Sequence, residues 1–212
     1  MENENKKIEE ADQLINIKNE KKDQKKKEKP PKASLKSEIF SWVKLTAFAL
    51  GIAFFINTVI IVNASVPTGS MRPTIESQSR LFAFRLSYLF SDPERLDVIV
   101  FNSPDGTRTR YVKRIIGMPG ETVDIISGQV FIDGSAEPLD EWYLLEPPAG
   151  PSFTPQSFVV PEGSFFVMGD NRNDSQDSRG LGRYPWNNLF VPQDNIMGRA
   201  LFMYFPRISG IR

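Results

Sequence analysis

Residues 110–116 read Arg-Tyr-Val-Lys-Arg-Ile-Ile, a short run rich in β-branched and aromatic side chains that is typical of a β-strand. Glycine, proline, aspartate and asparagine separate it from similar runs at residues 96–101, 122–126, 129–132, 158–160 and 164–168. Closely spaced short strands of this kind predict a mostly β domain over residues 65–212. A smaller subdomain is expected near residues 120–165.

An uncharged apolar segment, Leu45–Val62, precedes this domain. As a helix, its roughly 18 residues would extend about 27 Å, just enough to cross a bilayer. A cleaved signal peptide is the competing interpretation, because residues 62–64 (Val-Asn-Ala) resemble a small-residue cleavage site. The region before the segment is much longer than in a signal peptide, and the apolar core exceeds the usual ~7–15 residues. We therefore expect residues 40–64 to form one transmembrane anchor helix.

Charge divides the chain into two unlike parts. The first 44 residues carry twelve lysines and nine carboxylates, a net charge of +3, whereas residues 45–212 carry a net charge of −3. Residues 1–39 lack apolar area to bury and are expected to be a disordered tail. Because lysines crowd the N-terminal side of the anchor, we expect a single-pass protein of the cell membrane with a cytoplasmic tail and the β-rich domain on the outer face. The acidic balance of that domain argues against a nucleic-acid partner.

The chain contains no cysteine and no histidine. A thiol nucleophile, a disulfide framework, a Ser-His-Asp triad and a His-ligated zinc site are therefore all excluded within it. Any hydrolase built on this sequence must use another base.

Lys113 is the only lysine after the N-terminal 44 residues. Alternation along its strand places it on one face with Tyr111 and Ile115, where it would be poorly solvated. Desolvation lowers a lysine pKa from about 10.4 toward the range in which the neutral amine accepts a proton, and arginine cannot do this. Lys113 is thus a candidate general base. A lysine that protects a sheet edge is the alternative.

Residues 66–74 read Val-Pro-Thr-Gly-Ser-Met-Arg-Pro-Thr and form a candidate nucleophile loop. Gly69 allows a substrate carbonyl to approach the backbone, and the prolines on both sides stiffen the loop. Ser70 lies eight residues beyond Val62, and eight residues span at most about 26 Å, so it should lie near the membrane surface.

A third polar segment, residues 169–179, reads Gly-Asp-Asn-Arg-Asn-Asp-Ser-Gln-Asp-Ser-Arg. It could brace a site through hydrogen bonds, be a purely structural loop or bind calcium. Calcium is disfavoured because Arg172 occupies a ligand position and no bidentate glutamate closes the loop. We expect no metal and no cofactor.

These segments, in this order after one anchor, resemble bacterial type I signal peptidases. The resemblance covers roughly residues 40–206 and also rests on residues 96–101, 111–121 and 198–200. It implies a mostly β fold of two antiparallel sheet regions, around a catalytic core that is shared with self-cleaving repressors. It also implies a serine endopeptidase that removes signal peptides from secretory preproteins with small residues one and three positions before the cut.

The resemblance assigns a role to each matching residue. Ser70 matches the nucleophile and Lys113 the general base, while Thr68 helps the Ser70 N–H hold the oxyanion. Ser175 matches the serine that orients the base. The supporting positions are Asp177, Arg179, Asp170 and Arg114. Two departures from the family pattern stand out: Gln78-Ser79 after the nucleophile loop, and a longer, more aromatic stretch at residues 180–189.

Two other functions remain open. One is a non-catalytic membrane-tethered β-domain that binds envelope components, and the other is a self-cleaving repressor, which would need a DNA-binding helix pair. The apolar segment Leu81–Phe90 could pack in the core or partly touch lipid. We expect the protein to be a monomer.

Overall fold

The computed structural model describes residues 17–18, 35–107, 109–149, 154–180, 186 and 188–212. The tail expected at residues 1–39 therefore falls mainly outside the described residues, as does much of the unusual stretch at 180–189. The chain divides into two compact units, residues 1–51 and 52–212.

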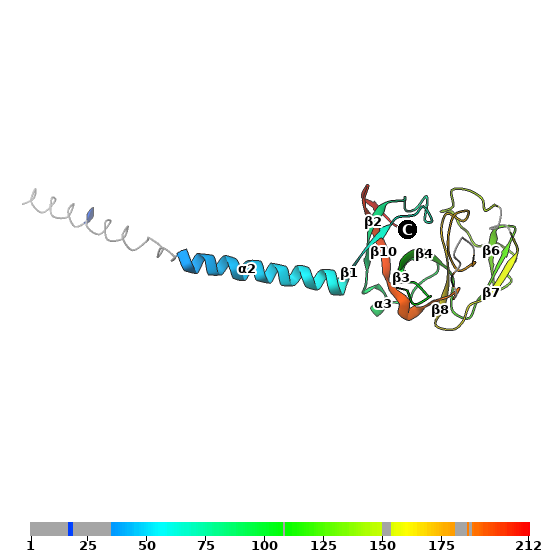
Figure 1. The fold of residues 1–212 in the computed structure, drawn as a ribbon, viewed down its shortest axis with the longest axis horizontal. Coiled ribbons are helices and arrows are strands. Elements are labelled where there is room, and N and C mark those ends of the chain that lie inside the picture. The colour runs from blue at the N-terminus through cyan, green and yellow to red at the C-terminus, as the bar shows by residue number, and fades with distance from the viewer. Residues whose placement is uncertain (1–16, 19–34, 108, 150–153, 181–185, 187) are drawn as a thin grey trace, which may run out of the picture. The chain divides into compact units, whose positions relative to one another are not determined.

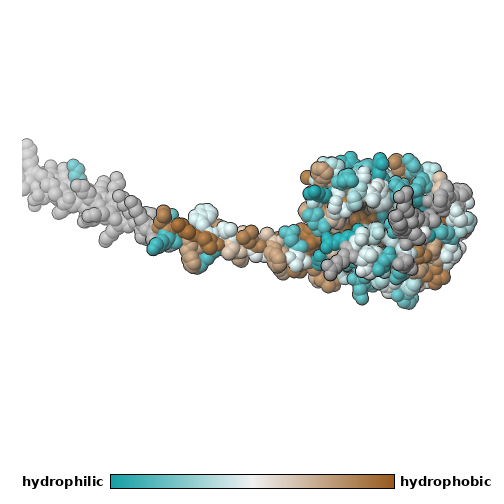
Figure 2. Space-filling model, in the orientation of Figure 1, coloured by the Kyte–Doolittle hydropathy of each residue, from teal (hydrophilic) through white to brown (hydrophobic). Residues whose placement is uncertain are grey.

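One long apolar helix lies at the N-terminal end of the described chain. Helix α2 (Leu35–Phe55) buries none of its side chains, and apolar residues cover much of its surface (Figure 2). It continues into a π-helical turn, η1 (Ile56–Ile60). Together they make a 26-residue helix with a mean hydropathy of 2.0, the one helix among the described residues that is long and apolar enough to cross a membrane.

The bounds of this helix differ from the expected 40–64 at both ends. It begins at Leu35, and residues 61–64 already belong to strand β1 (Ile61–Val66). β1 buries Val62, Ala64 and Val66 and pairs with strand β2 (Ser79–Phe84). The apolar run therefore combines a helical segment with the start of a β-strand. Its last β-branched residues belong to the strand and contribute to the core of the domain.

The main sheet of the domain is antiparallel throughout, which confirms the expected mostly β fold (Figure 1). Its strands follow the order β1-β2-β10-β3-β4-β8-β9, and β11 adds to β10. The remaining bounds are β3 (Val98–Asn102), β4 (Arg110–Gly117), β8 (Ser164–Met168), β9 (Val191–Pro192), β10 (Ile196–Phe205) and β11 (Ser209–Gly210). A 3-10 turn, η3 (Gln193–Asn195), connects β9 to β10.

A second, three-stranded sheet lies within residues 122–159, inside the region expected to form a subdomain. Its strands are β5 (Thr122–Ile126), β6 (Gln129–Ile132) and β7 (Gln156–Val159), in the order β6-β5-β7. Ser127 and Gly128, both at positive φ, make the tight turn between β5 and β6. Val123, Ile125 and Val130 of this sheet share a core cluster with Phe166 of β8, which joins the two sheets.

The apolar segment Leu81–Phe90 divides between core and surface. Leu81 and Ala83 of β2 are buried, while Phe82 stacks on Tyr204 of β10. The following short helix, α3 (Ser87–Phe90), leaves Leu89 and Phe90 exposed. Alternation within the strand accounts for the buried half, as a period of two requires.

Two strand edges of the main sheet have no strand partner within the described residues. β1 pairs only with β2, so its other edge is open. β4 pairs with β8 only from Arg114 onward, so the edge of residues 110–113 is open as well. β1 and β4 also approach each other in space. The two open edges therefore lie close together.

Candidate active site

Ser70 and Lys113 meet where these two open edges end. Ser70 lies in the turn that follows β1, and Lys113 lies in the middle of β4, opposite Ile99 of β3. Lys113 Nζ donates a hydrogen bond of 2.6 Å to Ser70 Oγ. Lys113 is only 2% exposed and Ser70 7%, so this contact is shielded from bulk water.

Burial changes the acidity of Lys113. Desolvation lowers its pKa from 10.5 to about 8, although Asp177 and Asp170 act in the opposite direction. Arg179 adds to the lowering. A substantial fraction of the amine is therefore neutral near pH 8, which is what a proton acceptor for the Ser70 hydroxyl requires.

The nucleophile loop is fixed by hydrogen bonds from the segment that follows β8. The Asn171 N–H donates to the Ser70 carbonyl at 3.0 Å, and Asn171 Nδ2 donates to the Gly69 carbonyl at 3.1 Å. Thr68 Oγ1 lies 3.4 Å from Ser70 Oγ and donates to it. Thr68 is thus close enough to the hydroxyl to reach an oxyanion formed beside it.

Asp177 and Arg179 form a buried ion pair next to Lys113. Both side chains are at most 1% exposed, and Arg179 Nη2 lies 2.8 Å from Asp177 Oδ2. Asp177 also accepts the Gly169 N–H at 3.0 Å. Burial alone would raise the pKa of Asp177, but the charge and hydrogen bonds of Arg179 outweigh it and lower the pKa below the usual value. Asp177 therefore stays ionised, and its charge is neutralised largely by Arg179.

A second buried pair joins the strand of the lysine to the same polar segment. Arg114 donates two hydrogen bonds to Asp170, from Nε to Oδ1 at 2.9 Å and from Nη2 to Oδ2 at 2.7 Å. Thr74 of the nucleophile loop also donates to Asp170. The Arg114 guanidinium stacks on the Tyr143 ring, 4.0 Å from its centroid. Arg114 follows Lys113 directly, so this pair fixes the position of the strand that carries the lysine.

Glu141 and Tyr143 were not identified from the sequence. Arg172 donates to both carboxylate oxygens of Glu141, which raises the arginine pKa although burial alone would lower it. Tyr143 donates to Glu141 at 2.8 Å, and burial raises its pKa. Thr74 and Asn171 were missed as well. The one available signal was Arg172 itself, since an arginine in a packed loop needs a carboxylate partner.

Ser175 does not make the contact expected of a base-orienting residue. It is 8% exposed, and among the described residues its hydroxyl makes no hydrogen bond to Lys113; it lies instead beside Asp177, whose pKa it helps to lower. Ser175 still lies at the site, because a Cβ added to Gly169 would collide with both Ser175 Oγ and the Ser70 carbonyl oxygen. Its role remains a prediction. Gly169 is the residue whose missing side chain lets the two serines approach.

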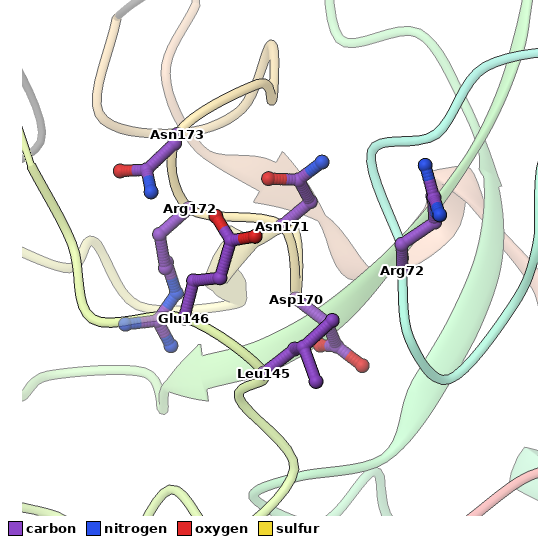
Figure 3. A pocket seen from close by; sticks show the side chains of 7 residues that line it. All are labelled: Arg72, Leu145, Glu146, Asp170, Asn171, Arg172 and Asn173. Carbon is purple, nitrogen blue, oxygen red and sulfur yellow. The ribbon is translucent and has the colours of Figure 1, made fainter.

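A shallow pocket of about 90 Å³ adjoins the nucleophile loop (Figure 3). In Figure 3, Arg72 lies on one side, Leu145 and Glu146 on the other, and Asn171 between them. The remaining lining residues are Asp170, Arg172 and Asn173. The dyad itself is not part of this lining, so the pocket is a separate feature beside it.

This antiparallel β-domain, with a serine hydroxyl buried against a lysine amine and no histidine, has the arrangement that Ser-Lys hydrolases use. Residues 39–205 match the protein family described as "Signal peptidase, peptidase S26". The chain is 39% identical over 171 residues to the probable signal peptidase I-1 of Synechocystis sp., which covers 77% of this chain and 81% of that protein. It is 37% identical over 186 residues to the signal peptidase I of Leptolyngbya laminosa, with 83% of each chain covered.

The chain also resembles a signal peptidase I from Enterococcus faecalis whose crystal structure has been solved. The two share 36% sequence identity, with a TM-score of 0.41, over 51% of this chain and 97% of that chain. The family match and the curated relatives together show that the chain belongs to the signal peptidase family, a family of serine peptidases.

Proposed function

We propose that the protein removes N-terminal signal peptides from secreted preproteins, with Ser70 as nucleophile and Lys113 as general base. The observation that carries this proposal is the buried 2.6 Å contact between Lys113 Nζ and Ser70 Oγ. Family membership supports the reaction class, and the names of the curated relatives support signal peptides as the substrate. The parts of this site all come from one chain, so it requires no second copy.

The proposed reaction begins with the neutral form of Lys113. Nζ takes the Ser70 proton while Oγ attacks the carbonyl carbon of the scissile bond, and the resulting oxyanion is held by the Ser70 N–H and the Thr68 hydroxyl. The tetrahedral intermediate collapses to an ester on Ser70, and the leaving amine takes the proton from Lys113. Water then attacks the ester with Lys113 as base. The carboxylate of the signal peptide leaves, and Ser70 regains its proton.

The open edges of β1 and of residues 110–113 support this substrate. Both strands run toward the dyad, so an extended peptide lying along them would bring its scissile carbonyl to Ser70. In an extended peptide, the first and third residues before the cut point to the same side. The requirement for small residues at these two positions would then reflect one protein surface that both side chains face.

We also infer that the helix Leu35–Ile60 anchors the enzyme in the lipid bilayer as a single span. The lysines of the N-terminal segment favour a cytoplasmic tail and an outer catalytic domain. Substrates in this arrangement would be membrane-associated preproteins.

The pKa of Lys113 sets an expected pH dependence. With a pKa of about 8, about 1% of the enzyme carries the neutral amine at pH 6 and about 90% at pH 9. We expect kcat/KM to rise roughly tenfold per pH unit up to about pH 7.5 and to level off above about pH 9. Initial rates on one peptide substrate across this range provide the measurement. A rate that is flat or falling between pH 6 and pH 8 contradicts Lys113 as the base.

The proposed activity is tested with the detergent-solubilised protein and one model preprotein. The expected product is a mature chain whose first residue follows an Ala-x-Ala end, as mass spectrometry of the products would show. A second preprotein with a bulky residue just before the cut serves as the matched control and should be processed poorly. If neither preprotein is cleaved, or if cleavage occurs at unrelated bonds, the proposal is wrong. A non-catalytic membrane-tethered domain then becomes the better interpretation of the protein.

A further inference from the structure

We propose that the pocket beside the nucleophile loop binds the substrate on the leaving side of the cleaved bond, within the first three residues of the mature chain, and that Glu146 there selects basic over acidic side chains. This inference rests on the proposed function. It adds a specificity-determining residue that belongs neither to the dyad nor to the two open strand edges.

The position of the pocket follows from the register of β4. Its edge is open at residues 110–113 and becomes covered by β8 from Arg114, which pairs with Met168. The chain then leaves β8 through Gly169 and reaches Asn171, which contacts the Ser70 carbonyl. The open edges of β1 and β4 therefore end at the dyad, next to Asn171. A peptide whose acyl part lies along these edges would continue past Asn171, which is one of the residues that line the pocket.

The walls of the pocket are preorganised. Asn171 is bonded to the nucleophile loop, and Asn173 holds the Leu145–Glu146 side by accepting the Ala149 N–H at 2.7 Å and donating to the Pro147 carbonyl at 3.2 Å. The three segments that form the pocket are thus linked to one another by hydrogen bonds. A built site of this kind can bind a side chain without first ordering its own loops.

The charges around the pocket leave one carboxylate uncompensated. Asp170 is paired with Arg114, Arg172 with Glu141, and Arg72 with Glu76 at 3.0 Å. Among the described residues, Glu146 has no ion-pair or hydrogen-bond partner, and it is exposed at the pocket rim. Its charge favours a lysine or arginine side chain in the pocket and disfavours a carboxylate. Leu145, 68% exposed, offers the apolar surface against which the stem of such a side chain can lie.

The experiment compares preprotein substrates that differ only in carrying Lys, Gln or Glu at the second residue after the cut. The wild-type enzyme should cleave the Lys substrate about three- to fivefold better than the Glu substrate in kcat/KM, as a partly exposed charge pair allows. Glu146→Gln should bring this ratio close to one, and Glu146→Lys should invert it. Raising the salt concentration should shrink the wild-type preference, because the charges are only partly shielded from water.

The matched control is Glu137→Gln, which removes an exposed carboxylate outside the pocket lining and should leave the ratio unchanged. Further substrates that carry Lys or Glu at the first or at the third residue after the cut identify which position faces Glu146. Suppose that the wild type cleaves all substrates at one site, but that its Lys/Glu ratio of kcat/KM equals that of Glu146→Lys at each of the three substrate positions. The pocket inference is then wrong, while the proposed function stands. If the wild type cleaves none of them, the proposed function itself fails.

Discussion

Replacement of Lys113 by methionine is expected to lower kcat by roughly 10⁴-fold or more, as losing one member of a catalytic unit does in other serine hydrolases. Methionine keeps most of the volume of the side chain but cannot accept the Ser70 proton. The fold should survive. Because the pKa of Lys113 falls from its ordinary 10.5 to about 8 on folding, the buried amine opposes folding increasingly as the pH drops from about 10.5 to about 8, and fully below pH 8. The midpoint of thermal unfolding of the variant at pH 7 should therefore be no lower than that of the wild type.

Lys113→Arg separates a base from a structural cation. Arginine preserves a positive charge and a long side chain, so it would rescue a lysine that served only to neutralise Asp177 or to protect an edge. It cannot be deprotonated, so it fails as a general base. We expect both variants, and Ser70→Ala, to be inactive in single-turnover assays on the model preprotein while showing wild-type circular dichroism. Activity in Lys113→Arg within tenfold of the wild type would remove the base assignment.

The dyad was assigned through the family resemblance, and each half also carried a local signal. Lys113 was conspicuous as the lone lysine of its domain on a strand, and Ser70 lay in a loop stiffened by proline. The structure places the two groups in contact although 43 residues separate them. Runs of β-branched and aromatic residues between turn residues predicted the strands, since these depend on neighbours along the chain, while the resemblance implied antiparallel sheets.

Features that depend on distant partners were not predictable. Glu141 and Arg172 are 31 residues apart, and neither carries a mark that identifies the other. The end of the anchor was misplaced for a related reason. Ile61 and Val62 suit a helix in lipid and a buried strand equally well, and only pairing with β2 decides between them. Likewise, the spacing of residues 169–179 could not show that the Ser175 hydroxyl lacks a hydrogen bond to Lys113.

Replacement of Asp170 by asparagine is expected to lower the free energy of unfolding by about 3–5 kcal/mol, because it leaves the buried Arg114 guanidinium without its counter-charge. Arg114 is 1% exposed, so water cannot take the place of the lost carboxylate. The midpoint of thermal unfolding should fall by on the order of 10 °C for a domain of this size. Processing activity should fall as well, since the same segment holds the Ser70 carbonyl through Asn171.

Burial is the reason for this large effect, and a matched pair in the same domain tests it. Arg95 and Glu121 make a bidentate pair of the same kind, but their side chains are 26% and 19% exposed. Glu121→Gln should therefore cost only about 1 kcal/mol. The double variant Arg114→Met with Asp170→Asn removes the stranded charge and should recover much of the lost stability, giving a large favourable coupling in the double-mutant cycle. Equal losses in Asp170→Asn and Glu121→Gln would mean that packing, rather than an unpaired buried charge, gives Asp170 its importance.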